Sequence, residues 1–171
     1  MSRRLKQLWF VVGSGLAVAL VILAISFIRP DQEVVELLDL DEVNAHIDAG
    51  GVLLEMPVED VVRLLGEGEY VEGFGGYGHD YDDLCLLVSF NYNDVVIKLD
   101  ICNDQYAIYG VQVGDTIDSA SDKLLAAGFE LLNQKENIFK NKQVYMSLHG
   151  KSEVEQISVW LLNPEDEDVE Y

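Results

Sequence analysis

Basic residues are scarce in this chain, and their scarcity limits what it can bind. Beyond residue 30 there are 7 Lys and Arg residues against 31 Asp and Glu residues, a formal charge of −24. A surface of this sign repels nucleic acid and anionic lipid head groups, so polyanion binding is excluded. The acidity favours solubility, and its alternative meaning is attraction of a basic protein partner or of divalent cations.

Residues that build familiar catalytic and metal sites are also few. The three histidines, His46, His79 and His149, have no partner at the spacing of a metal site or a catalytic triad. Gly-x-Ser-x-Gly and Walker motifs are missing, and the glycines between 73 and 78 lack the flanking strand and helix of a phosphate-binding loop. The sequence therefore assigns no catalytic residue and predicts a protein that is not an enzyme.

A long run without charge lies near the N-terminus. Residues 8–28 contain no charged side chain, and at about 1.5 Å rise per residue a helix of this length crosses a hydrocarbon core of about 30 Å. A cleaved signal peptide would have a shorter apolar core and a small-x-small cleavage site, which is missing here. No cysteine precedes Cys85, so a lipidated N-terminal cysteine is excluded.

The charges that flank this run predict its orientation. Arg3, Arg4 and Lys6 precede it, which favours a cytoplasmic N-terminus at 1–7. The sequence thus predicts a single-pass signal-anchor that contacts membrane lipid through residues 8–28. Everything after it is expected to lie outside the cytoplasm, in a bacterial envelope.

Apolar periodicity and turn residues divide the rest of the chain into elements. In chain order we expect a stalk with a short helix at 29–52, a helix at 57–65, a long loop at 66–83, strands at 84–90, 95–102 and 107–113, a helix at 116–127, strands at 143–148 and 154–162, and an acidic disordered tail at 163–171.

We interpret these elements as two copies of a unit of one helix and three strands, at about 53–106 and 107–162, with helices that start near 57 and 116. Each unit alone has too little apolar surface to be stable, and two together complete a core. The predicted fold class is α+β: an N-terminal transmembrane helix, then an extracytoplasmic domain at 53–162. That domain would be an antiparallel sheet with helices on one face, built from two α-β-β-β repeats.

Two turns carry a resemblance to a known family. The segment Val111-Gln112-Val113-Gly114-Asp115-Thr116 is followed by a helix that ends at Gly128, and residues 53–58 are similar to the same unit, ending in Leu65-Gly66. This pattern resembles the repeat of β-lactamase-inhibitor-protein-like and SmpA/OmlA-like domains. The resemblance implies a non-catalytic module that binds other proteins through its sheet face and loops.

The two cysteines, Cys85 and Cys102, flank the predicted hairpin. The apolar residues expected to face the core are Leu84, Leu86, Val88 and Phe90 on the first strand and Val95, Ile97, Leu99 and Ile101 on the second. If both sets do so, directly opposed residue numbers sum to 187 or 185. The first register places the cysteines opposite each other and permits a disulfide, whereas the second places them diagonally. A bridge and two independent thiols both stay open.

The loop at 66–83 is the segment with the most binding character. Asp80, Asp82 and Asp83 could bind Ca²⁺ through carboxylate oxygens, but their spacing is not that of an EF-hand. The loop also carries four aromatic residues on a glycine-rich backbone, a common recognition surface. The four are Tyr70, Phe74, Tyr77 and Tyr81, and the predicted partner contacts are Phe74, Tyr77 and Tyr81.

The functional prediction is a membrane-anchored interaction or envelope-assembly module without catalysis or cofactor. The protein partner is unknown. If the negative charge of the domain serves recognition, the partner is expected to be basic. The alternatives are a calcium-responsive binding domain and an enzyme with an unrecognised site near the acidic loop. If the loop does not bind, the outer sheet face around Lys98 and Asp100 is the expected surface.

Overall fold

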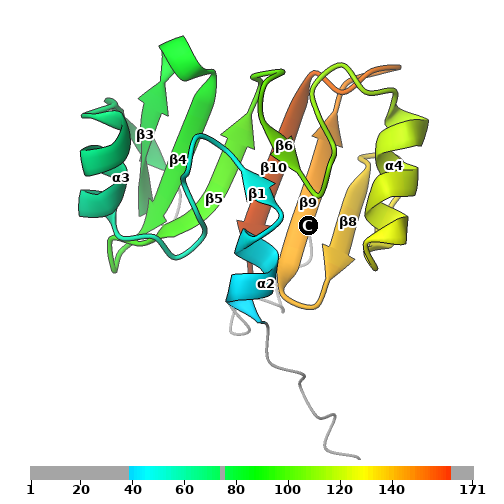
Figure 1. Ribbon diagram of the computed structural model, residues 1–171, viewed down its shortest axis with the longest axis horizontal. Helices are drawn as coiled ribbons and strands as arrows, with labels where there is room; N and C mark the ends of the chain where they lie inside the picture. Colours follow the sequence, from blue (N-terminus) through cyan, green and yellow to red (C-terminus); the bar gives the residue numbers. More distant parts are fainter. Residues whose placement is uncertain (1–38, 74–75, 163–171) are drawn as a thin grey trace, which may run out of the picture. The chain divides into compact units, whose positions relative to one another are not determined.

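A computed structural model describes residues 39–73 and 76–162, which all belong to the unit Leu38–Tyr171. Most of this part is an eight-stranded antiparallel sheet in the order β2-β3-β4-β5-β10-β9-β8-β7, and a two-stranded ribbon of β1 and β6 lies over it (Figure 1). The strands are β1 (Ile47–Asp48), β2 (Glu69–Gly73), β3 (Gly76–Tyr81), β4 (Leu86–Asn91), β5 (Val96–Ile101), β6 (Ala107–Ile108), β7 (Glu130–Asn133), β8 (Ile138–Asn141), β9 (Val144–His149) and β10 (Gln156–Leu161). The helices are α2 (Leu40–Asn44), the 3-10 helix η1 (Asp82–Leu84), α3 (Val58–Leu65) and α4 (Ile117–Ala126).

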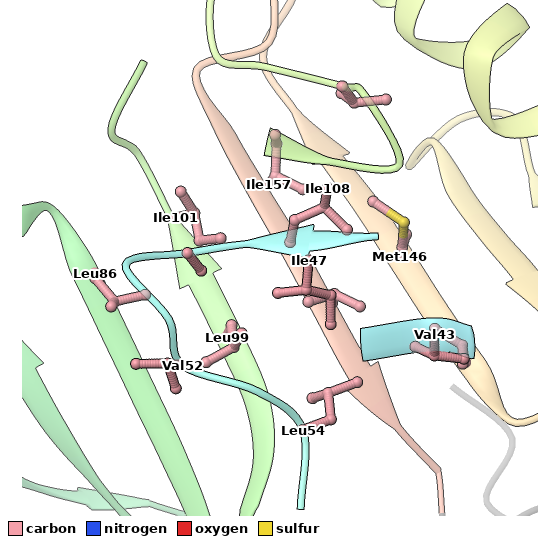
Figure 2. Close-up of a cluster of buried hydrophobic side chains, with 14 of the residues drawn as sticks. Val43, Ile47, Val52, Leu54, Leu86, Leu99, Ile101, Ile108, Met146 and Ile157 are labelled. Atoms are coloured by element: carbon pink, nitrogen blue, oxygen red, sulfur yellow. The ribbon is translucent and has the colours of Figure 1, made fainter. Parts of the chain in front are cut away.

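The core lies on one face of the large sheet. Alternate residues of each strand are buried there, as Leu86, Val88 and Phe90 are on β4. Residues that precede α3 cover part of this core face of the sheet. Figure 2 shows Val43 of α2 and Ile47 of β1 in the same apolar cluster as the strand residues. The described part of the expected stalk therefore belongs to the core.

The central hairpin has the register in which opposed numbers sum to 187, as in Leu86↔Ile101 and Val88↔Leu99. The register shifts by one residue beyond Ser89, so Phe90 pairs with Val96. This irregularity turns Ile97 away from the core, although simple alternation predicted that it faces inward with Leu99.

The predicted fold class is wrong. Strands outnumber helices in the described part, and four strands of the large sheet rather than three follow each of α3 and α4, so the two α-β-β-β repeats are not found. Among the residues that the structure describes, no helix is long and apolar enough to cross a membrane. The predicted anchor at 8–28, its cytoplasmic flank at 1–7 and the tail at 163–171 lie outside those residues.

The loop predicted at 66–83 is also wrong, because β2, β3 and η1 occupy most of it. Its glycines serve close packing of strands. A Cβ on Gly76 would lie 1.9 Å from the carbonyl oxygen of Phe90, and one on Gly78 would lie 3.1 Å from the Leu87 side chain. A larger residue at either position would push β3 away from β4. Glycine therefore allows this segment to pair with β4 as a strand.

Two short strands, β7 and β8, lie between residues 128 and 143, where the sequence pattern predicts no strand. They are four residues long and mix polar with apolar side chains, so they carry little alternation. In contrast, the stop of α4 at Gly128 is confirmed. Gly128 N donates to Leu125 O and Phe129 N to Leu124 O, with Gly128 at φ +86°.

The turn before α4 is held by a charged side chain. Asp115 Oδ2 accepts hydrogen bonds from the Gln112 amide at 2.8 Å and from Lys123 Nζ at 2.7 Å. Burial acts to raise the pKa of the Asp115 carboxyl, but the Lys123 and Gln112 hydrogen bonds outweigh it and hold the pKa below its usual range.

Replacement of this carboxylate, Asp115→Asn, is expected to lower the free energy of unfolding by about 1–2 kcal/mol at pH 7. Because the pKa is lower in the folded state, the contribution is complete above the unfolded value of about 3.9 and is lost as the pH falls through the folded value. Urea denaturation from pH 3 to pH 7 should show wild type and variant converging at the acid end. Asp118→Asn, an exposed change in the first turn of α4, is the control and should show no such pH-dependent gap.

Candidate partner-binding surface

The β2–β3 hairpin lies at one edge of the sheet and exposes an aromatic pair. All five residues of the edge strand β2 are exposed, and Tyr70 is 65% exposed. Its ring stacks on that of Tyr77, with centroids 5.7 Å apart, and Tyr77 in turn stacks on the buried Phe90 at 5.2 Å. The Tyr70 ring is thus fixed by stacking on Tyr77, which itself packs on the core. Because the ring is already ordered, less conformational entropy is lost when a partner covers it.

Carboxylates surround this aromatic pair. Tyr77 Oη donates to Asp94 Oδ1 at 2.8 Å. The pKa of Tyr77 is raised to about 12. Burial is the largest cause, and the hydrogen bond to Asp94 and the charges of Asp94, Tyr70 and Glu59 add to it. Glu72 is paired directly with Tyr77 across the hairpin. We define the hairpin surface as Glu59, Tyr70, Glu72, Tyr77 and Asp94; it combines π faces with negative charge.

Of the three predicted contact residues, the structure places only one on this surface. Tyr77 belongs to it, whereas Phe74 lies outside the described residues. Tyr81 is only 7% exposed and its hydroxyl donates to the Gly66 carbonyl at 3.1 Å, so it is part of the core. Tyr70 carries most of the exposed aromatic area of this surface, because it lies in the edge strand β2 opposite His79, and its exposure could not be read from the sequence.

The three carboxylates of the calcium hypothesis occupy different surroundings. Asp80 lies in β3 opposite Leu87, on the sheet face away from the core, while Asp82 and Asp83 are exposed residues of η1. Within residues 39–73 and 76–162, no group of three or more His, Cys, Asp or Glu residues is placed to hold a metal ion.

Cys85 and Cys102 form a disulfide, with their Cα atoms 5.2 Å apart. The bridge joins the residue after η1 to the residue after β5, and the Cys102 amide also donates to the Cys85 carbonyl at 3.0 Å. The sheet thereby gains a covalent link at the end of its central hairpin, β4–β5, and β4 is the neighbour of β3 in the strand order.

A polar cluster lies on the sheet face away from the core, where Lys98 and Asp100 were considered as an alternative binding surface. Asp100 accepts from the buried Ser158 hydroxyl at 2.5 Å and pairs with Lys98 Nζ at 2.9 Å. His149 Nε2 lies 3.1 Å from the same hydroxyl. Since Ser158 gives its single proton to Asp100, the order of groups differs from a catalytic triad, in which the imidazole stands between serine and carboxylate.

The other two histidines contact aromatic rings instead. His79 packs edge-on against Phe90 at 5.1 Å, close to Tyr77 and Tyr81. His46 stacks on Tyr109 at 4.8 Å. The three histidines therefore occupy three separate environments, and none of them stands between a carboxylate and a hydroxyl as in a catalytic triad.

Comparison with known proteins gives a likeness in fold. No family model and no curated protein matches the chain. An extracellular protein containing an SCP domain, from Bacillus anthracis str. Ames, matches with a TM-score of 0.53 and 10% identity over 78% of this chain and 50% of that one. A cysteine-rich secretory protein from Staphylococcus aureus subsp. aureus Mu50 matches with a TM-score of 0.49 and 11% identity over 70% of this chain and 48% of that one. The chain thus spans about half the length of these proteins.

The resemblance to β-lactamase-inhibitor-protein-like and SmpA/OmlA-like domains is therefore wrong. A solved structure that is similar in fold is described as containing an SCP domain, and more than three strands follow each of α3 and α4, which does not fit an α-β-β-β repeat. The short motif behind the resemblance, a turn at Gly114 and a helix stop at Gly128, is common to many helices that precede a strand, because it reflects helix capping. Such a motif does not determine how many strands follow.

Proposed function

We propose that this domain acts outside the cytoplasm as a protein-interaction module, without catalysis and without a cofactor, and that its hairpin surface binds a basic polypeptide segment. The observation that carries the proposal is the supported, exposed ring of Tyr70 among carboxylates. An arginine or lysine side chain lying over this ring would gain a cation–π contact and also pair with Glu72.

Two further observations support a place outside the cytoplasm. The Cys85–Cys102 disulfide is of a kind that persists in oxidising compartments. The Bacillus protein whose fold is similar is described as extracellular. Strong negative charge beyond residue 30 suits a basic partner, because it speeds encounter and disfavours acidic competitors.

Charge also argues against self-association through the edge strand β2. Glu69 and Glu72 lie on this strand, so a second copy pairing there would bring like charges together. A basic segment meets no such penalty. The same carboxylates that protect the edge from aggregation thus select a partner of opposite sign.

Tyr70→Ala is expected to raise the Kd for a synthetic peptide of alternating Arg and Val residues about 2- to 5-fold, which corresponds to the loss of one exposed cation–π contact. Combining it with Glu72→Gln should weaken binding further, and raising the salt concentration should reduce binding by wild type. Fluorescence anisotropy of the labelled peptide measures each Kd.

Tyr92→Ala is the matched control, because Tyr92 is 82% exposed on the β4–β5 turn and is not part of the hairpin surface. It should leave the Kd unchanged. No loss from either variant would mean that the peptide is attracted by overall charge alone, and equal losses would mean that the exposed tyrosines act without regard to position. Either result would reject the hairpin surface as the site. A rise in melting temperature on adding Ca²⁺ that needs Asp80, Asp82 and Asp83 would favour the calcium-responsive alternative instead.

A further inference from the structure

A cleft of about 410 Å³ opens on the other half of the domain, away from the hairpin surface in the strand order. Its walls come from α2, from the segment after β6, from the end of α4 and from the β8–β9 turn. This volume lies within the range of small-molecule and side-chain pockets. The floor is apolar, with Val43 and Val144 buried beneath it.

One wall of the cleft is a fixed aromatic pair. The rings of His46 and Tyr109 are stacked with centroids 4.8 Å apart and planes at 25°. The Tyr109 amide donates to the His46 carbonyl at 2.8 Å, and Phe129 packs edge-on against the Tyr109 ring at 4.9 Å. Tyr109 also holds a left-handed backbone, φ +51°, which only a well-determined surrounding keeps in place.

The groups around this wall are mostly negative. Asp39 and Glu42 line the cleft, and neither carboxylate is ion-paired within the described residues. The carbonyl end of α4, at Ala126 and Ala127, adds the negative end of a helix dipole. Burial raises the pKa of the Tyr109 hydroxyl and Glu42 adds to the effect, so the field of Glu42 reaches the aromatic wall.

One cation, Lys142, also lines the cleft, and it has interactions of its own. It lies on the β8–β9 turn, whereas both carboxylates come from the N-terminal side of α2. A positively charged ligand would therefore approach the carboxylates and the aromatic wall with Lys142 as an internal competitor. An anion would face two carboxylates and a helix C-terminus, and is disfavoured.

We propose that this cleft binds a guanidinium or primary ammonium group, with the cation over the His46–Tyr109 wall and paired with Glu42 and Asp39. The group could be carried by a free small molecule or by an arginine or lysine side chain of a polypeptide; the chemistry of recognition is the same. This site is independent of the hairpin surface, so either can fail without the other.

The test is an NMR titration of the full-length protein with N-acetyl-arginine amide, with N-acetyl-citrulline amide as the neutral analogue of the same shape. The arginine compound should shift the ring signals of His46 and Tyr109 saturably, and the citrulline compound should not. Glu42→Gln should weaken binding about 3- to 10-fold, and Lys142→Gln should strengthen it, because the competitor is removed.

Asp41→Asn provides the matched control, since Asp41 is exposed on the same helix and does not line the cleft. It should leave the affinity unchanged, and circular dichroism should show that every variant is folded. Equal shifts with both compounds, or equal losses from the Glu42 and Asp41 variants, would overturn the proposal.

A short Arg-containing peptide distinguishes the two sources of the cation. If it shifts the same rings at a concentration at least tenfold lower than N-acetyl-arginine amide, the cleft recognises a side chain within a polypeptide. If its affinity equals that of the amide, contacts beyond the charged group add nothing and the site belongs to a free small cation.

Discussion

Removing the Cys85–Cys102 disulfide is expected to lower the free energy of unfolding by about 3 kcal/mol, one of the two largest effects that the structure predicts. The cysteines are 17 residues apart, and a bridge of that span limits the conformations of the unfolded chain. Urea denaturation of the double variant Cys85→Ser/Cys102→Ser against wild type measures the difference.

Reduction provides the control for this experiment. Dithiothreitol should destabilise wild type by a similar amount and leave the serine variant unchanged. If the double variant is as stable as wild type, or if the reductant affects both proteins equally, the two sulfurs are not bridged in the folded protein. The support that the bridge lends to an extracytoplasmic location would then be lost.

Leu99→Ala is expected to lower the free energy of unfolding by about 2–5 kcal/mol, because it removes a fully buried side chain where β5 meets β10. Leu99 is paired with Val88 on one side and Val159 on the other, both of them buried. Chemical denaturation of the folded variant measures the loss.

Ile97→Ala is the matched control, since Ile97 lies two residues away in the same strand. Simple alternation would give both residues the same burial, but the register shift leaves Ile97 partly exposed. Its replacement should cost less than about 1.5 kcal/mol, as expected for a residue that is not fully buried. Similar losses at both positions would contradict the bulge and restore the regular register.

The central hairpin shows how far a sequence pattern can reach. Leu86, Val88 and Phe90 occupy alternate positions of β4, and the period of two correctly predicted that they face the core. The same pattern failed at Ile97, because a bulge depends on how two strands fit together and leaves no mark in either strand alone. It failed again at β3, whose glycines look like loop residues until Phe90 is seen packed against Gly76.

The candidate site was only partly accessible from the sequence. Tyr77 was identified because aromatic residues stand out in an acidic, glycine-rich segment. The difference between Tyr70 and Tyr81, one exposed and one buried, depends on which is in the edge strand and which lies next to β4. The cleft at His46 and Tyr109 was not predicted, since its walls are more than 60 residues apart and only folding brings them together.

The sequence by itself determined the sign of the surface, the absence of recognised catalytic motifs and the ends of the two longer helices. These properties depend on composition or on contacts within a few residues, such as the Gly128 stop of α4. Tertiary structure alone decided the number of strands, the pairing of β5 with β10 and the side chains that share a surface. Those features depend on long-range backbone pairing and burial, whose energies are set by partners that no local stretch of sequence specifies.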